Sequence, residues 1–245
     1  MPMTSPSAPR LHVDALLAPG AIIELPPHVV RHVSALRLAP GADITLFNGQ
    51  GGEYGARLER VGRGGTFAKI AAYRESERES PLSVTLALGV SAGDRMDVAI
   101  QKSTELGVTA IQPIEMERSI VRLSAERAER RMLHWQAVAV SACEQCGRNR
   151  VPEVRPLISL DEFLDAPMEG ARLLLSPQGE RGLRDLERAN TVTLLIGPEG
   201  GLAPYERERA TSLGFEAVRF GPRVLRTETA PLAVIAALQA LWGDC

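Results

Sequence analysis

The sequence predicts an α/β protein with two domains, a small N-terminal β-barrel-like domain and a larger domain built on a parallel sheet. From residue 83 onward, apolar runs typical of buried strands alternate with helical patterns, which is the order that a parallel sheet requires. Three of these runs are followed by loops rich in Gly, Pro and hydroxyl side chains, at the sheet edge where α/β proteins bind ligands. The length supports two domains, because 245 residues with 44% hydrophobic content can bury a large and a small core.

Residues 1–74 are predicted to form the small domain. Residues 1–9 are rich in Pro and Ser and are expected to be a mobile tail. Turn residues separate strand signals at 21–23, 43–47, 54–58 and 66–70, and one helix is expected at 27–38. The charged segment 75–81 ends at Pro81 and is predicted to be a linker, so the larger domain is expected to span residues 82–245.

The larger domain is predicted to alternate strands with helices and to end in an apolar helix. Strands are expected at 83–90, 110–113, 172–175, 191–196 and 217–220, and helices at 96–106, 125–147, 183–189, 204–213 and 230–242. The last helix has almost no polar face, because its leucine, isoleucine and valine side chains lie among five alanines. A helix of this kind is buried on more than one side, which predicts a subunit interface.

Charge is distributed unevenly along the chain. The net charge is -2, but residues 1–74 carry eight Lys and Arg against five Asp and Glu, a balance of +3, which leaves -5 for the remainder. Lys69 and Lys102 are the only lysines, so 26 of the 28 cationic side chains are arginine. Arginine suits phosphate and stacks on bases, although codon usage in a GC-rich genome would produce the same bias.

The cysteine content predicts a reducing compartment and no metal. Three cysteines make no disulfide framework, and no signal peptide or long apolar span is visible, so we expect a cytoplasmic protein without membrane attachment. Cys143 and Cys146 form a CxxC motif, but it lies in a helical pattern. No second pair or nearby His cluster completes a zinc site, so neither metal binding nor redox chemistry is predicted.

Three loops at successive strand ends are expected to form a ligand pocket. They are residues 175–179, 196–201 and 220–230. Their glycines let the backbone come close to a ligand. Neither G-x-G-x-x-G nor G-K-[ST] is present, so binding of a dinucleotide or a nucleoside triphosphate is disfavoured. A plain turn would explain any one Gly-Gly pair, but three such loops at one sheet edge predict a pocket built mainly from backbone.

Eight short runs follow one another along the chain in a familiar order. They are RLHV (10–13), HVSALRL (32–38), LFNG (46–49), KSTELGV (102–108), ERS (117–119), EQCGRNRVPEV (144–154), GPEGG (197–201) and RVLRTETAPLAVIAALQ (223–239). Together they resemble the SPOUT-class 16S rRNA uridine-N3 methyltransferases, and the first three resemble the PUA-like RNA-binding domain of that family. The resemblance covers nearly the whole chain.

The resemblance implies a trefoil knot in the C-terminal part of the larger domain, with S-adenosylmethionine bound in the knot. It also implies a homodimer joined through this domain, including the C-terminal helix, and a substrate that is 16S rRNA in the small ribosomal subunit. The cofactor-binding residues that it implies are Leu175, Ser176, Pro177, Ile196, Gly197, Pro198, Glu199, Gly200, Gly201, Phe220, Gly221, Val224, Leu225, Arg226, Thr229 and Ala230.

Arg226 and Glu228 are the candidate catalytic residues. Uridine N3 carries a proton near neutral pH, so the enzyme must align the reactants and stabilise a uracil that loses this proton. Arg226 is expected to stabilise charge on a uracil oxygen or to steer the RNA, and Glu228 to accept or orient the proton. Alternatively, Glu228 caps the last helix through its first-turn amides while Arg226 pairs with a carboxylate.

Further residues are candidates for binding RNA. Phosphate contacts are expected from Arg118, Arg122 and Arg148, contacts to an extruded base from Gln145 and Asn149, and an RNA-facing patch from Arg10, His32 and Arg37. Lys102 and Glu105 lie three residues apart on one helix face, so they are either a solvated ion pair or part of the RNA path. Cys146 replaces the serine usual in the family, which removes any hydroxyl-specific role there.

Two other functions fit the same features. One is a ribose 2'-O-methyltransferase of the same knotted class, which would differ in what the pocket presents to the RNA. The other is a non-catalytic RNA-binding or ribosome assembly protein that keeps the fold without turnover. The intact glycine loop and the LRTETA segment (225–230) argue against this last function, because a degenerate pocket would be expected to fill with bulky side chains.

Overall fold

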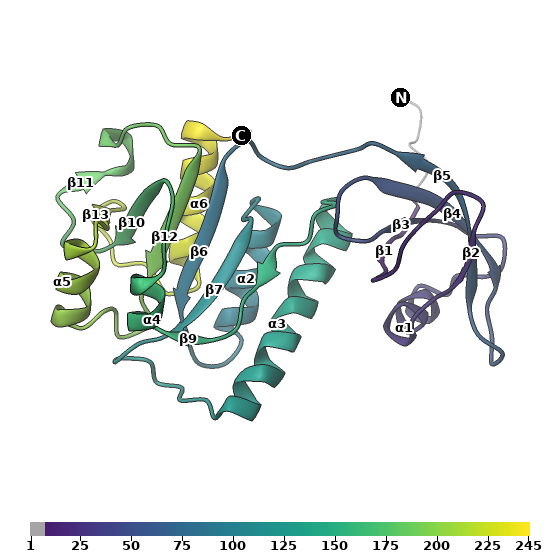
Figure 1. Ribbon diagram of the computed structural model, residues 1–245, viewed down its shortest axis with the longest axis horizontal. Helices are drawn as coiled ribbons and strands as arrows, with labels where there is room; N and C mark the ends of the chain where they lie inside the picture. The colour runs from purple at the N-terminus through teal and green to yellow at the C-terminus, as the bar shows by residue number, and fades with distance from the viewer. Residues whose placement is uncertain (1–7) are drawn as a thin grey trace. The chain divides into compact units, whose positions relative to one another are not determined.

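The computed structural model describes residues 8–245, and the chain divides into two compact units (Figure 1). Unit 1 comprises the residues up to Glu79 together with residues 143–151, and unit 2 comprises Ser80–Ala142 and Pro152–Cys245. The predicted mobile tail lies outside the described residues as far as residue 7. Residues 143–151 join unit 1, although the predicted boundary at residue 82 places them in the larger domain.

Unit 1 is a curled five-stranded sheet with one helix. Its strands are β1 (Arg10–His12), β2 (Ile22–Glu24), β3 (Asp43–Phe47), β4 (Glu53–Arg60) and β5 (Phe67–Arg74), in the order β1-β3-β4-β5-β2. All neighbouring strands are antiparallel except β1 and β3. Helix α1 (Pro27–Ala35) begins with a proline at its first position, where no amide donor is needed, and buries Val29 and Val33 in the core of the unit.

Unit 2 is built on a larger sheet in which every strand pairing is parallel. The first strands and helices are β6 (Ser83–Gly89), α2 (Arg95–Glu105), β7 (Ala110–Glu115), α3 (Ala125–Cys146), β8 (Glu153–Val154), β9 (Ile158–Ser159) and α4 (Leu160–Asp165). They are followed by β10 (Ala171–Leu175), β11 (Arg181–Gly182), the 3-10 turn η1 (Leu183–Asp185), β12 (Thr191–Ile196), α5 (Pro204–Ser212), β13 (Glu216–Arg219) and α6 (Thr229–Trp242). The strand order is β11-β13-β10-β12-β6-β7-β8, and β9 also pairs with β7.

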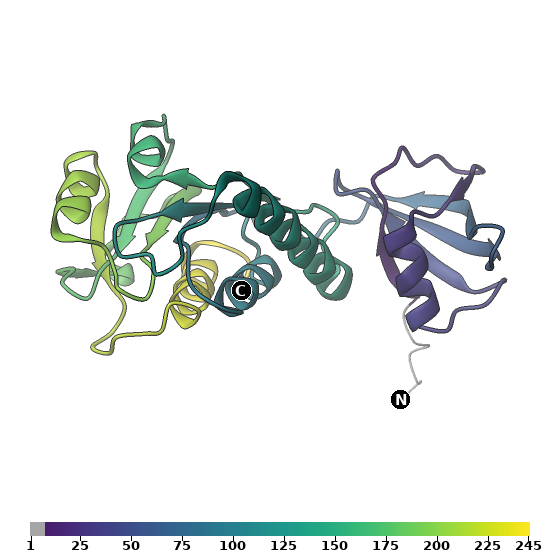
Figure 2. The ribbon, with the colours of Figure 1, turned by 90° about the horizontal axis from the view of Figure 1, so that it is seen from below.

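Helices cover both faces of this sheet, so its central strands are largely buried. One face packs α4 and α5 through a core that includes Phe163, Leu174, Leu195 and Phe215. The other face carries α2 and α6, which pack side by side (Figure 2). Burial on two faces explains why five consecutive residues of β12 are buried, where a strand with one solvent face would alternate.

The path of the chain brings three loops to one edge of the sheet. Strand β10 lies between β12 and β13, so the chain passes across β10 through α5 before it forms β13. It then returns past the ends of β10 and β12 to enter α6, on the opposite face. This return places the segments after β10, β12 and β13 together at the carboxyl ends of the strands. The knot crossing itself stays a prediction of the family resemblance.

The predicted helix at 183–189 is wrong. The chain forms only the single turn η1 and is extended again at Leu186. Leu183 is the one buried side chain of that turn, so a second helical turn would have no apolar face to bury. The side chain of Asp185 instead accepts a hydrogen bond from the Gly182 amide at 2.8 Å.

No helix among residues 8–245 is long and apolar enough to cross a membrane.

Candidate active site

The carboxyl ends of β10, β12 and β13 open into a pocket of about 770 Å3, a size that suits a small-molecule ligand. Three segments line it, which we name the first loop (residues 176–180), the second loop (197–203) and the third loop (220–228). Every residue expected to bind the cofactor lines the pocket except Thr229, which is exposed at the start of α6. The structure therefore brings together residues more than fifty positions apart in the sequence.

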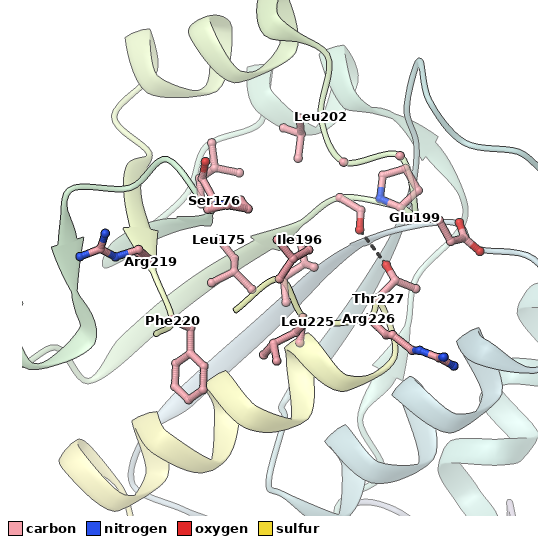
Figure 3. Close-up of a pocket in the computed structure, with 18 of the residues that line it drawn as sticks. Leu175, Ser176, Ile196, Glu199, Leu202, Arg219, Phe220, Leu225, Arg226 and Thr227 are labelled. Carbon is pink, nitrogen blue, oxygen red and sulfur yellow. Dashed lines mark hydrogen bonds between the residues drawn. The ribbon is translucent and has the colours of Figure 1, made fainter. Parts of the chain in front are cut away.

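A hydrogen bond joins the second loop to the third. Thr227 is buried, and its hydroxyl donates to the carbonyl oxygen of Gly197 at 3.0 Å (Figure 3). Ser176 fixes the first loop by two hydrogen bonds. Its Oγ accepts from the Gln178 main-chain amide at 3.3 Å, and its own main-chain amide donates to the Val218 carbonyl oxygen at 2.9 Å. Thr227 was missed as a pocket residue, although its place in the LRTETA segment was a signal for it.

Glycine is required in the second loop by close packing. A Cβ atom on Gly197 would lie 2.9 Å from the carbonyl carbon of Gly201. A Cβ atom on Gly89, at the end of β6, would lie 2.5 Å from the nitrogen of Pro198. Gly201 also has a φ of +64°, which side chains rarely adopt. The loop is therefore pressed against itself and against β6, and its main-chain groups stay at the pocket surface.

Arg95, at the start of α2, joins two glutamates of the pocket. Its Nη1 lies 2.7 Å from Glu199 Oε1 in the second loop, and its Nε lies 3.6 Å from Glu228 Oε2 at the end of the third loop. The Ala92 amide also donates to Glu199 Oε1 at 2.9 Å. Burial by itself would raise the pKa of Glu199, but the hydrogen bonds from its own amide, from Ala92 and from Arg95 lower the pKa below its usual value.

Glu228 presents a carboxylate to the pocket. It precedes the first residue of α6, but its side chain makes no capping hydrogen bond, so the capping half of the alternative is wrong. The other half holds, because Arg226 pairs with a carboxylate, that of Glu228 itself. Oε2 is buried and has no hydrogen-bond partner among the described residues. Arg226 extends into solvent with 84% of its side chain exposed, and its Nη1 is 4.0 Å from Glu228 Oε1. The two candidate catalytic side chains therefore lie at one place, the carboxylate inside the pocket and the guanidinium at its mouth.

Among the charged side chains that line the pocket, cations outnumber anions. The charged lining residues are Arg95, Arg118, Arg207, Arg219, Arg223, Arg226, Glu199 and Glu228, a balance of +4 in a chain whose net charge is -2. Within the described part of the chain, Arg219 and Arg223 pair with no carboxylate. Arg118 donates to the carbonyl oxygen of Gly200 at 3.1 Å, which places one predicted phosphate contact over the second loop.

The other RNA-binding candidates of unit 2 lie in exposed ion pairs. Lys102 Nζ is 2.8 Å from Glu105 Oε1, as the solvated-pair alternative expects. Arg122 donates to Glu115 Oε1 at 2.8 Å and to the Glu117 carbonyl oxygen at 2.9 Å. None of these side chains lines the pocket.

Three RNA-binding candidates of unit 1 make hydrogen bonds or ion pairs with other residues of that unit. Arg148 is 4% exposed, and its Nη2 lies 2.5 Å from Glu79 Oε2. Asn149 is fully buried and accepts a hydrogen bond from Arg10 at 2.5 Å, while Arg10 also pairs with the buried carboxylate of Glu53. These contacts attach residues 143–151 to unit 1. We therefore assign Arg10, Arg148 and Asn149 a structural role and do not carry them forward as RNA contacts.

The remaining candidates of unit 1 lie nearer its surface. Gln145 and Arg37 are exposed, and Arg37 has the left-handed φ of 53° that is rare outside glycine. His32 is partly exposed, with Nδ1 3.4 Å from Glu144 Oε2. Gln145, Arg37 and His32 therefore remain candidates for contact with RNA.

The CxxC motif forms no metal site. Cys143 is fully buried, and burial raises the pKa of its thiol to about 12, so the thiol stays protonated and unreactive near neutral pH. Its Sγ lies 3.6 Å from the Arg150 carbonyl oxygen, within donating distance. Among residues 8–245, no group of His, Cys, Asp or Glu side chains could hold a metal ion.

The two units of the chain each match a family found in RNA methyltransferases. Residues 78–239 match the RNA methyltransferase domain family, and residues 25–71 match the RNA methyltransferase PUA domain family. Within that class, the chain belongs to the family of ribosomal RNA small subunit methyltransferase E. The enzyme of that name from Bacillus subtilis is 32% identical over 226 residues, which cover 86% of this chain and 88% of the relative.

Two solved structures are similar along nearly the whole chain. Ribosomal RNA small subunit methyltransferase E from Neisseria gonorrhoeae, bound to S-adenosylmethionine, is 45% identical with a TM-score of 0.91. A Legionella pneumophila protein in complex with the same cofactor is 40% identical with a TM-score of 0.95. Each comparison covers 97% of this chain and 99% of the other.

Proposed function

We propose that this chain binds S-adenosylmethionine in the three-loop pocket and transfers its methyl group to N3 of a uridine in 16S rRNA of the small ribosomal subunit. The observation that carries the proposal is the +4 charge of a pocket that also has a buried carboxylate oxygen. The cofactor is itself cationic at sulfur, so it does not account for the surplus of arginine. A polyanion such as RNA, docked over the pocket, would account for this surplus of arginine.

The residues of the pocket suit this cofactor. Main-chain amides and carbonyls of the three loops can bind an adenine and a ribose, which explains the four glycines and three prolines in the lining. Gly197 and Gly201 keep the second loop compact and leave its backbone accessible. Ile196, Phe220 and Leu225 provide apolar surface beside these polar groups. When bound, S-adenosylmethionine supplies an electrophilic methyl group.

Two side chains of the pocket would act on the uracil. Glu228 accepts the N3 proton while the N3–methyl bond forms and the sulfur–methyl bond breaks. Arg226 stabilises the negative charge that develops on a uracil oxygen, because its exposed guanidinium can follow the base as it enters. The target uridine must be unpaired or extruded, since its N3 edge is the pairing edge.

The proposal extends to the partner and the compartment. The apolar composition of α6 favours a homodimer that uses this helix, because Leu241 remains exposed in the single chain. A substrate in the small ribosomal subunit places the reaction in the cytoplasm.

The product of the reaction tests this proposal. Small subunits from a strain lacking the activity are incubated with the protein and the cofactor, and the rRNA is digested to nucleosides. We expect 3-methyluridine, and we expect Glu228→Gln to slow its formation by about 100-fold or more. Methyl on a ribose would support the 2'-O alternative. Binding of the cofactor without any methylated nucleoside would support a non-catalytic protein.

A further inference from the structure

We propose that Arg95 is a positioning residue, which holds the Glu228 carboxylate in place beside the pocket through a bridge that is anchored on Glu199. This inference rests on the proposed function, because it concerns the group that accepts the uridine proton. Arg95 lies outside the three loops, at the first residue of α2. Nothing in its local sequence distinguishes it from the other 25 arginines of the chain.

The geometry of the bridge is asymmetric. Glu199 binds Arg95 tightly, with Nη1 to Oε1 at 2.7 Å, and shares that oxygen with the Ala92 amide. Glu228 lies farther away, with 3.6 Å between Arg95 Nε and Oε2. That distance is short enough for charge attraction but too long for a hydrogen bond. Glu199 therefore fixes the guanidinium, and the guanidinium attracts the Glu228 carboxylate through Oε2.

Burial makes this charge compensation necessary. The side chains of Glu199 and Glu228 are 20% and 21% exposed, and without a cation two carboxylates this close to one pocket would repel each other. Arg226 cannot replace Arg95, because it is 84% exposed and lies 4.0 Å from the other oxygen of Glu228. Of these two arginines, only Arg95 contacts the buried oxygen Oε2.

The bridge also joins the parts of the pocket. Arg95 comes from the segment after β6, Glu199 from the second loop and Glu228 from the third loop. Thr227, next to Glu228, bonds the second loop at Gly197. The hydrogen bond thus fixes the position of the Glu228 backbone, and the ionic bridge fixes its side chain.

Three substitutions of Arg95 test the role. Arg95→Gln removes the charge, Arg95→Lys keeps one charge without the fork that reaches both glutamates, and Arg95→Ala leaves room for added guanidinium. Arg130→Gln is the matched control, because Arg130 is an exposed arginine of α3 paired only with Glu126. For each protein we measure kcat and KM for the small subunit in the steady state. We also measure the Kd of S-adenosylmethionine and the melting temperature.

We expect Arg95→Gln to lower kcat by about 10-fold or more. KM and Kd should stay within about twofold of the wild type, and the melting temperature within a few degrees. Arg95→Lys should recover part of the rate, and guanidinium should restore part of the rate of Arg95→Ala but not change Arg130→Gln. In a Glu228→Gln background, Arg95→Gln should cause no further loss, because the residue acts through that carboxylate.

Two outcomes would overturn the inference. One is an Arg95→Gln protein that retains the kcat of Arg130→Gln. The other is an equal fall in kcat from Arg95→Gln in the wild-type and Glu228→Gln backgrounds, which would show that Arg95 acts elsewhere. A wild-type protein that forms no methylated nucleoside would instead overturn the proposed function, so the two failures are distinguishable.

Discussion

The arginines of unit 1 and those around the pocket of unit 2 differ in what their guanidinium groups contact. Arg148 is buried against Glu79, and Arg10 bonds Glu53 and Asn149, so these charges are neutralised within the unit. Arg219 and Arg223 line the pocket and pair with no carboxylate among the described residues. The same residue type thus stabilises the fold in one region and leaves charge available for a ligand in the other. Burial and pairing distinguish the two roles.

The largest effect is expected from Arg148→Met, which removes the buried cation and leaves Glu79 without its partner. Loss of one member of such a pair should lower the free energy of unfolding of unit 1 by about 3 kcal/mol. Both tryptophans lie in unit 2, so hydrogen exchange at the amides of β4 is the suitable measurement. Arg150→Met is the control, since Arg150 is more than half exposed. Equal protection in the two variants would refute the structural role of Arg148.

Arg219→Gln combined with Arg223→Gln should change RNA binding rather than stability. If each arginine contacts one phosphate, the slope of log K against log salt for the small subunit should fall by about one for each residue. The Kd of the cofactor should stay within about twofold, because the cofactor brings no phosphate. An unchanged salt slope would show that the positive lining of the pocket serves another purpose.

A smaller effect is expected on the pH dependence of the stability of unit 1, through His12. Burial lowers the pKa of its imidazole below the usual 6.5, against the opposing influence of its contact with Asn48 and of the charges of Glu144 and Asp14. The unfolded chain therefore binds the proton more readily than the folded chain, so unit 1 should lose stability as the pH falls below 6.5. Amide exchange in β3 above and below this pH should show the loss. His12→Gln should reduce it, and an unchanged pH dependence would contradict the assignment.

The smallest effect is expected from Lys102→Gln. Its partner Glu105 is on the same exposed helix face, and such pairs contribute less than about 0.5 kcal/mol. Chemical unfolding of unit 2 should therefore be nearly unchanged. A fall in the salt slope of RNA binding in this variant would show that Lys102 is on the RNA path after all.

The sequence predicted those features that depend on neighbouring residues. Strands β3 and β12 lie at the predicted positions, because their apolar runs are bounded by turn residues. The three loops follow from glycine, proline and hydroxyl residues after each strand. The helix predicted at 183–189 is wrong, because the apolar pattern there is too short to distinguish one helical turn from two.

The features that the sequence could not predict depend on distant residues. Arg95, Glu199 and Glu228 meet only because β6, β12 and α6 converge, and no local pattern records that meeting. Arg148 and Asn149 carry the residue types of an RNA contact, yet their contacts with Glu79 and Arg10 bury them. Pairing in three dimensions decides the role of a charged side chain, and a linear pattern does not contain it.

A crystal structure of the chain with S-adenosylmethionine tests the central claim most directly. We predict the cofactor between the first, second and third loops, with its adenine and ribose bound by main-chain groups and its methyl group directed toward the Glu228 carboxylate. Cofactor bound outside these loops, or bound within them with the methyl group directed away from Glu228, would contradict the account.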